Sequence, residues 1–256
     1  MPATPAWPPK SVPRLYVPDR DLEVGSEMVL DDQHGHYLAN VMRLRVDAQV
    51  MLFDNETGEY LASITEVKKS AVTIIIEEWM RERESVPDLW LCAAPIKKDR
   101  WHFMAEKACE LGIDRFCPVR TERTISDRIR MDKLEAHMIE AAEQCERTAL
   151  PSIAEIQDLP DMLAQWPEGR HIFFADERLF ERGQGSFRKA LVDHPGPAAI
   201  LIGPEGGFTD KENLMIRQHA QSVAVSLGPR ILRAETAALA AISLWMSGRG
   251  DWTPES

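Results

Sequence analysis

The sequence predicts two domains, a small β-rich unit followed by a larger α/β unit built on a parallel sheet. Residues 14–76 hold short runs of β-branched and aromatic residues separated by turn signals, the pattern of a small β-barrel. The segment 77–87 is charged and ends in proline. We place the boundary there, with one domain over residues 1–80 and the other over 81–256. In the second domain strand and helix patterns alternate, which indicates parallel strands joined by crossover helices.

The elements of the first domain follow from its composition and turns. The run 72–76 is rich in β-branched residues, and the turn Asp54–Gly58 separates two further runs that suit paired strands. The expected strands span residues 15–17, 50–53, 60–64 and 72–76, and a short helix is expected over 36–41.

The elements of the second domain follow from apolar spacing and capping signals. Apolar residues at helical spacing from Trp101 to Leu111 predict a helix that ends at Gly112. Thr209 and Glu212 fit a capping box that opens a helix reaching residue 219. Further helices are expected over 131–145 and 234–246, and strands over 89–93, 116–119, 171–175, 198–202 and 223–227.

Composition excludes several classes of protein. The 256 residues are 44% apolar and 28% charged, which suits a globular protein with a sizeable core. We see no secretory signal, and the longest apolar stretch, 234–246, is too short to span a bilayer, so we expect a cytoplasmic protein that does not associate with membranes. The net charge of −11 argues against indiscriminate coating of nucleic acid but permits a local basic face.

No metal site is expected. His34 and His36 could form a pair of ligands, but no third ligand lies near them in the sequence. The chain has four cysteines in no CxxC or CxH arrangement, which we expect to be reduced: Cys92, Cys109, Cys117 and Cys145.

Two glycine-bearing loops carry the strongest functional signal. One runs from Gly203 to Gly207 after the strand candidate 198–202, and the other begins at Gly228 after the candidate 223–227. Loops that follow strands of one parallel sheet meet at its carboxyl edge, where open α/β sheets hold small ligands. Because glycine lets the backbone approach a ligand closely, we expect main-chain groups to form a site that suits an adenine edge and a small zwitterion.

Neither loop has the spacing of a phosphate-binding motif. A dinucleotide fingerprint needs GxGxxG at the start of the first crossover helix, and a Walker loop ends in GK[ST], whereas these loops have neither pattern. An NAD-dependent dehydrogenase is therefore disfavoured. Arg230, Arg233 and Glu235 crowd the second loop, so a ligand site is favoured over a purely structural turn.

The motifs taken together resemble one family. GPEGGF-T-x-x-E from Gly203 and LGxRILRxETA from Leu227 resemble the signature of the bacterial 16S ribosomal RNA uridine-N3 methyltransferases (RsmE), which belong to the SPOUT superfamily. Ala234 departs from the pattern, because the family commonly has threonine there. Other segments extend the resemblance over nearly the whole chain: Arg14–Val17, His36–Arg45, Lys107 with Glu110–Gly112, and Glu140–Arg147.

The resemblance implies a fold, a cofactor and an assembly. The fold would be a SPOUT-type parallel sheet with a deep trefoil knot, preceded by a PUA-like β-barrel that binds RNA. The protein would be a homodimer that uses S-adenosylmethionine to methylate uracil N3 at a specific uridine of 16S rRNA in the small ribosomal subunit. Backbone groups of both loops would hold the cofactor, with contacts at Leu201, Ile202, Gly203, Glu205, Gly206, Gly207, Leu227, Gly228, Ile231, Leu232, Thr236 and Ala237.

Four residues are catalytic candidates for this reaction. Uracil N3 must lose its proton, and the developing negative charge spreads onto O2 and O4, where an arginine can stabilise it. Arg233 is the first candidate and Arg230 the second, because they flank the second loop. Glu205 or Glu235 could orient an arginine or take part in removing the proton.

Basic residues are expected to hold the RNA. Phosphate contacts would position it, and target choice would come from RNA shape and a splayed-out uridine. The expected contacts are Arg14, Arg43, Arg45, Lys97, Arg123 and Arg147.

Two other functions stay open. One is a methyltransferase that acts on transfer RNA, and the other is a ribosome-assembly factor that binds RNA and cofactor without turnover. The small N-terminal barrel and the segment 140–147 favour ribosomal RNA over transfer RNA. A factor without turnover is disfavoured by three residues that match the family signature, Arg233, Glu235 and Thr236. It stays open because Ala234 departs from that signature.

Overall fold

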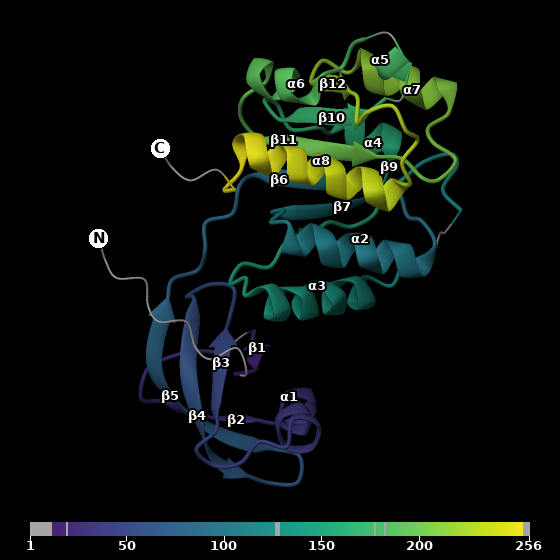
Figure 1. Ribbon diagram of the computed structural model, residues 1–256. Coiled ribbons are helices and arrows are strands. Elements are labelled where there is room, and N and C mark those ends of the chain that lie inside the picture. Colours follow the sequence, from purple (N-terminus) through teal and green to yellow (C-terminus); the bar gives the residue numbers. More distant parts are fainter. Residues whose placement is uncertain (1–11, 19, 126–128, 177, 182, 253–256) are drawn as a thin grey trace. The chain divides into compact units, whose positions relative to one another are not determined.

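The computed structural model describes residues 12–18, 20–125, 129–176, 178–181 and 183–252 (Figure 1). The chain divides into two compact units. The first contains the residues up to Ser85 together with Ala142–Ala149, and the second contains Val86–Ala141 and the residues from Leu150 onward. Helix α3 (Met131–Cys145) therefore contributes residues to both units.

The first unit is built on a five-stranded sheet in the order β1-β3-β4-β5-β2. β1 pairs with β3 in parallel, and the other pairs are antiparallel. Alternate strand residues face a common apolar core that includes Val50, Ile64 and Ile74, as the two-residue repeat of a strand requires. The strands are β1 (Arg14–Tyr16), β2 (Glu27–Leu30), β3 (Gln49–Phe53), β4 (Glu59–Val67) and β5 (Val72–Arg81).

Between β2 and β3 the chain forms two short helical turns. They are α1 (Asp32–His36) and the π-helical η1 (Tyr37–Val41), which buries Leu38 in the core. The expected helix over 36–41 is therefore confirmed in place, although its backbone is π-helical and a turn of α-helix precedes it.

Ion pairs and hydrogen bonds hold the segment 142–149 in the first unit. Glu84 accepts the backbone N–H groups of Thr148 and Ala149, each at 3.1 Å, and its carboxylate lies 3.3 Å from Nε of Arg147. Arg81 donates to the carbonyl of Glu146 at 2.6 Å. These partners lie 63 to 65 residues apart in sequence, so they come together only in the folded unit.

The second unit is built on a seven-stranded sheet with the order β12-β10-β11-β6-β7-β8, to which β9 adds by pairing with β7. The neighbouring strands of this sheet pair in parallel. The strands are β6 (Leu89–Ala93), β7 (Arg115–Arg120), β8 (Ser152–Ile153), β9 (Gln157–Asp158), β10 (His171–Ala175), β11 (Ala198–Ile202) and β12 (Ser222–Val225).

Helices cover both faces of this sheet. The remaining helices are α2 (Lys98–Glu110), α4 (Leu159–Ala164), α5 (Arg178–Glu181), α6 (Phe187–Asp193), α7 (Asp210–Gln218) and α8 (Ala234–Arg249). On one face α8 contacts β6, β11 and α2 (Figure 1). On the other face α4 and α7 contribute Met162 and Ile216 to a core that also contains Phe174 and Leu201. The predicted α/β class with a parallel sheet is confirmed.

Two expectations about the elements need correction. The charged segment 77–87 begins as strand rather than linker, because β5 continues to Arg81, where the side chain of Arg81 reaches Glu59 of β4 at 2.7 Å. The last helix extends beyond residue 246 to Arg249, whose Nε donates to the carbonyl of Leu191 at 2.9 Å.

Candidate active site

Three neighbouring strands end at one edge of the parallel sheet. β10 lies between β11 and β12, so the loops that follow β11 and β12 flank the residue that follows β10. These segments line one cavity of about 460 Å³. This volume lies in the range of small-molecule sites, which is roughly 300–1,000 Å³. The predicted meeting of the two glycine-bearing loops is confirmed.

The loop after β11 is a tight turn closed onto the start of α7. The N–H of Gly207 donates to the carbonyl of Pro204 at 2.8 Å, and Gly207 has φ of 66°, a region that glycine adopts without strain. A Cβ at Gly203 would meet the ring of Phe208 at 3.1 Å. The backbone is thus exposed to the cavity at a place where a side chain would crowd it.

The loop after β12 presents arginines at the cavity. Gly228 has φ of 103°, and its N–H donates to Oγ of Ser226 at 3.2 Å. Arg233 is the N-cap residue of α8, in extended conformation. Arg230 and Arg233 are both exposed and line the cavity.

Most of the predicted cofactor contacts line the cavity. Thr236 is the exception, because it is exposed on α8 and does not line it. Ala234 lines the cavity in the position where the family resemblance predicts threonine. The predicted contacts that do line it are Leu201, Ile202, Gly203, Glu205, Gly206, Gly207, Leu227, Gly228, Ile231, Leu232 and Ala237.

The four catalytic candidates divide into two groups. Glu205, Arg230 and Arg233 line the cavity, and Glu205 is exposed. Glu235 is 8% exposed and does not line the cavity; its Oε1 lies 3.6 Å from Nε of Arg100 on α2. Glu235 therefore pairs with Arg100 rather than with Arg230 or Arg233, and its predicted role in catalysis stays a prediction.

The cavity contains an acidic residue that the sequence analysis missed. Asp176 directly follows β10, is 5% exposed and forms an ion pair with Arg217 of α7. Its N–H donates to the carbonyl of Val225 at 2.8 Å, which ties the end of β10 to β12. One feature of the sequence could have indicated Asp176: it directly follows the strand expected over residues 171–175, at the carboxyl edge of the sheet.

Arg123 also lines the cavity, although it was predicted to contact RNA. Its guanidinium donates to the carbonyl of Gly206 at 2.7 Å, and its aliphatic stem would lie 3.4 Å from a Cβ added at Gly206. The N–H of the preceding residue, Glu122, donates to Glu212 of α7 at 2.8 Å. The segment after β7 is therefore fastened to the loop after β11.

Two of the predicted RNA contacts are buried, and we do not retain them. Arg14 pairs with Glu59 and has a side chain that is 6% exposed. Arg147 pairs with Glu84 and is also 6% exposed. A phosphate would have to displace a carboxylate to reach either guanidinium.

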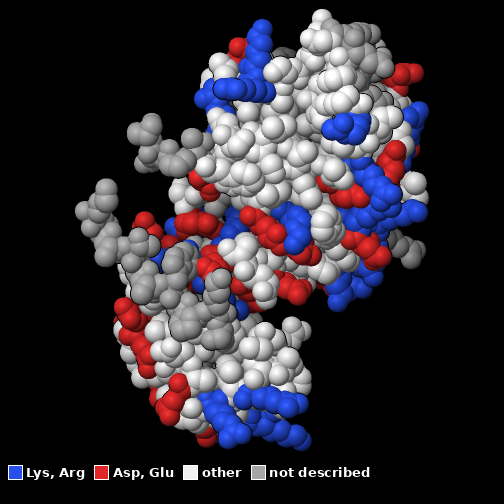
Figure 2. Space-filling model, in the orientation of Figure 1, with Lys and Arg blue, Asp and Glu red and all other residues white. Residues whose placement is uncertain are grey.

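The remaining predicted RNA contacts, Arg43, Arg45 and Lys97, are exposed. Figure 2 shows basic side chains gathered at one end of the first unit and along one side of the second. The acidic total charge therefore coexists with local basic surfaces, as the sequence analysis allowed.

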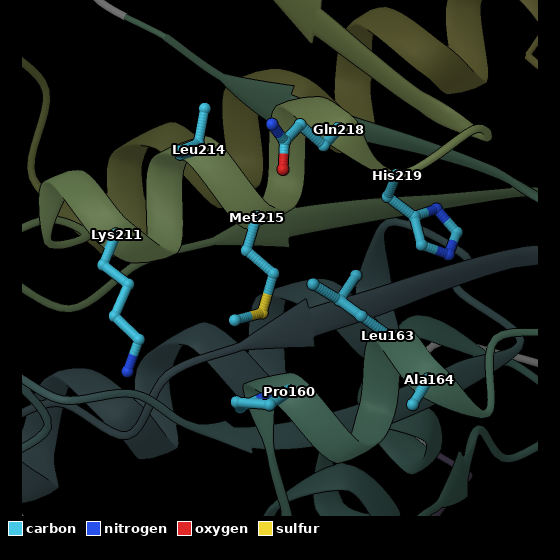
Figure 3. Close-up of a pocket in the computed structure, with 8 residues that line it drawn as sticks. All are labelled: Pro160, Leu163, Ala164, Lys211, Leu214, Met215, Gln218 and His219. Atoms are coloured by element: carbon cyan, nitrogen blue, oxygen red, sulfur yellow. The ribbon is translucent and has the colours of Figure 1, made fainter.

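A second hollow lies on the α4 and α7 face of the sheet and lacks the features of a reactive site. Leu163 and Met215 extend toward the same space, between Pro160 and Leu214 (Figure 3). Its ionisable side chains are Lys211 and His219, and its described lining contains neither a carboxylate nor a glycine-bearing loop. Among the described residues, no cluster of three or more metal-ligating side chains occurs, and no helix has the length and apolarity needed to cross a membrane.

Comparison with known proteins agrees with this geometry. Residues 82–246 match the model of an RNA methyltransferase domain, and residues 30–77 match that of an RNA methyltransferase PUA domain. The chain is 31% identical over 231 residues to ribosomal RNA small subunit methyltransferase E of Rickettsia conorii, covering 90% of this chain and 93% of that one. It is 27% identical to the Bacillus subtilis protein of the same name, covering 88% and 91%.

A solved structure has the same fold. It is a ribosomal RNA small subunit methyltransferase E from Neisseria gonorrhoeae, bound to S-adenosyl methionine. It is 30% identical to this chain, with a TM-score of 0.83, and the match covers 94% of this chain and all of that one. The chain belongs to the RNA methyltransferase family of which the ribosomal RNA small subunit methyltransferase E proteins are members.

Proposed function

We propose that the protein transfers a methyl group from S-adenosylmethionine to N3 of a uridine in 16S rRNA. The observation that carries the proposal is the single cavity formed by both glycine-bearing loops, with Arg230 and Arg233 exposed beside it. Family membership supports the reaction class, and the N3 position and the uridine are our inference from the motif resemblance.

The residues that line the cavity fit the proposed cofactor. Gly203 and Gly207 bring backbone groups to the surface of the cavity, and apolar side chains such as Leu201 and Leu232 suit the flat face of an adenine. When bound, the cofactor supplies a methyl group on a positively charged sulfur. Asp176 adds a buried carboxylate that suits a hydroxyl or ammonium group of such a ligand.

Two arginines and a glutamate are assigned roles at the uracil. The N3–C bond forms as the S–C bond breaks, and the N3 proton leaves. The guanidinium of Arg233, with Arg230 as the second candidate, stabilises negative charge on the uracil oxygens, an effect of a few kcal/mol per well-placed donor. Glu205 is favoured over Glu235 to accept the proton, because only Glu205 lines the cavity.

The proposal extends to the RNA contacts, the two domains and the oligomeric state. Arg43, Arg45 and Lys97 contact RNA phosphates, with the PUA-like first domain over residues 1–80 and the SPOUT domain over 81–256. We further propose a knotted second domain, a homodimer with the cofactor near the subunit interface, and action on the small ribosomal subunit in the cytoplasm.

The reaction is tested by mass spectrometry of 16S rRNA from a strain that lacks the protein. We expect loss of one N3-methyluridine, restored by the wild type. Retention of that nucleoside in the deletion strain would contradict the proposal. A modification lost from transfer RNA instead would favour the transfer RNA alternative, and unchanged RNA with intact cofactor binding would favour an assembly factor.

Arg233→Ala tests the assigned role. We expect the single-turnover rate to fall at least 10²-fold, the size typical of a removed charge-stabilising donor, while cofactor affinity measured by calorimetry changes little. Arg188→Ala is the matched control, because Arg188 is exposed on α6 and does not line the cavity. An unchanged single-turnover rate in Arg233→Ala removes this residue from the mechanism.

A further inference from the structure

Two cysteines lie side by side on neighbouring strands of the second unit. Cys92 of β6 and Cys117 of β7 are register partners in a parallel pair. Both belong to the core on the α4 and α7 face of the sheet, so their side chains share one face. Neighbouring strands lie about 4.8 Å apart, which is within the range of Cα separations, roughly 4.4–6.8 Å, that a disulfide bridges.

The pKa values of the two thiols are shifted in opposite directions. A hydrogen bond with Cys92 lowers the pKa of Cys117, and Arg115 and Arg170 lower it further, against the opposing effect of burial. The pKa of Cys92 is raised by the same hydrogen bond and by its complete burial. Of the two thiols, Cys117 therefore loses its proton more readily.

The charges of Arg115 and Arg170 favour the thiolate form of both cysteines. The guanidinium groups of Arg115 and Arg170 lie 4.9 and 3.7 Å from the ring centre of Trp90. Arg170 is held by both carboxylate oxygens of Asp88, at 2.7 and 2.8 Å. Among the described residues, Nε of Arg115 and Nε of Arg170 are both buried without a hydrogen-bond partner.

Cys117 is reachable from outside. It lines a cavity of about 370 Å³ together with Trp90, Arg115 and Trp166. Cys92 does not line this cavity and is 0% exposed. The arrangement therefore has one thiol at a cavity and a second, buried thiol beside it on the neighbouring strand.

From this geometry we propose that Cys117 and Cys92 form an oxidation site that reacts with a small hydroperoxide. The Cys117 thiolate attacks one peroxide oxygen, so an S–O bond forms and the O–O bond breaks, and hydroxide or an alkoxide leaves. The Cys92 thiol then attacks the sulfenic sulfur of Cys117, which forms a disulfide and releases water. The peroxide is reduced, both sulfurs are oxidised, and a dithiol reductant restores the pair. This site is independent of the proposed methyl transfer.

Reduced wild-type protein treated with limiting hydrogen peroxide tests the proposal without any substitution. Peptide mapping after alkylation should find a Cys92–Cys117 link, formed at least about tenfold faster than oxidation of Cys145. Cys145 is the internal reference because it is exposed. Faster oxidation of Cys145, or no link between Cys92 and Cys117, overturns the proposal.

Two variants then separate the roles of the thiols. In Cys92→Ser the sulfenic acid of Cys117 should persist and be trapped by dimedone, whereas in Cys117→Ser the buried Cys92 should stay reduced. Arg115→Gln should slow the oxidation of Cys117 several-fold and leave that of Cys145 unchanged. Oxidation of Cys117 at the wild-type rate in Arg115→Gln, or of Cys92 in Cys117→Ser, contradicts the assigned roles.

Discussion

Asp54 holds the turn between β3 and β4 through its carboxylate. Oδ1 accepts the backbone N–H groups of Glu56 and Thr57, each at 2.8 Å, and Oδ2 accepts the hydroxyl of Thr57. Burial alone would raise the pKa of Asp54, but these hydrogen bonds outweigh it and lower the pKa. The charged form is therefore the one that stabilises the fold.

Asp54→Asn should destabilise the protein by about 1.5–3 kcal/mol at pH 7, the usual range for hydrogen bonds to a charged group. Because the pKa of the folded state is depressed, this contribution is complete above the unfolded-state pKa of about 3.9 and is lost as pH falls through the folded-state value. Urea unfolding at several pH values measures it. Glu56→Gln, in the same turn, should show no such difference, and a wild-type advantage that persisted at the acid end would contradict the explanation.

At the residue scale, the sequence does not reveal the distant partners of charged side chains. Arg14 is basic, yet it is buried against Glu59, which lies 45 positions away in the chain. Arg123 is exposed, and its guanidinium also donates to the carbonyl of Gly206, 83 positions away. By contrast, the cavity positions of Gly203 and Gly228 were predictable, because local spacing after a strand is sufficient to place a loop.

At the element scale, the capping box of α7 links the first loop to its helix. Oγ1 of Thr209 accepts the N–H of Glu212 at 3.2 Å, and Glu212 accepts the N–H of Thr209 at 2.8 Å. Asp210 and Asn213, in the first turn of the helix, line the cavity. The cap therefore begins the helix and also positions residues of the site.

Thr209→Ala should lower the free energy of unfolding by about 1 kcal/mol, with a range of roughly 0.5–2, because it leaves an N–H at the helix start unpaired. Thr209→Ser retains the oxygen and should lose much less. Chemical denaturation of the two variants beside the wild type measures both values. Equal losses in the two variants would show that the methyl group, not the hydrogen bond, is responsible.

A long periodic helix and several buried five-residue strands were predictable, and the shortest strands were not. The helix over residues 131–145 and the strands 89–93, 171–175 and 198–202 match the structure residue for residue. The two-residue strands β8 and β9 contain no periodic signal, because their pairing with β7 depends on tertiary contact. The strand β2 was missed for a related reason, since only one of its four residues is fully buried.

At the scale of the whole molecule, each unit has its own core. The first unit packs around Leu38, Val50 and Ile74, and the second contains a separate cluster around Phe174 and Leu201. The alternation of strand and helix patterns predicted a parallel sheet. The order of the strands along the chain does not reveal that β10 lies between β11 and β12. That position puts Asp176 between the loops, which explains why the sequence analysis missed this residue.

Because the residues that line the cavity all belong to the second unit, S-adenosylmethionine should stabilise that unit alone. At a free concentration of 100 times its dissociation constant, a ligand that binds only the folded state contributes about 2.7 kcal/mol. Hydrogen–deuterium exchange should slow in β10, β11, β12, α7 and α8 and stay unchanged in β3, β4 and β5. ATP is the control ligand. It shares the adenine but should protect less than S-adenosylmethionine does at the same concentration, because the loops lack a phosphate-binding motif. Equal slowing in both units would mean that they open together, and stronger protection by ATP would contradict a site built for a zwitterion.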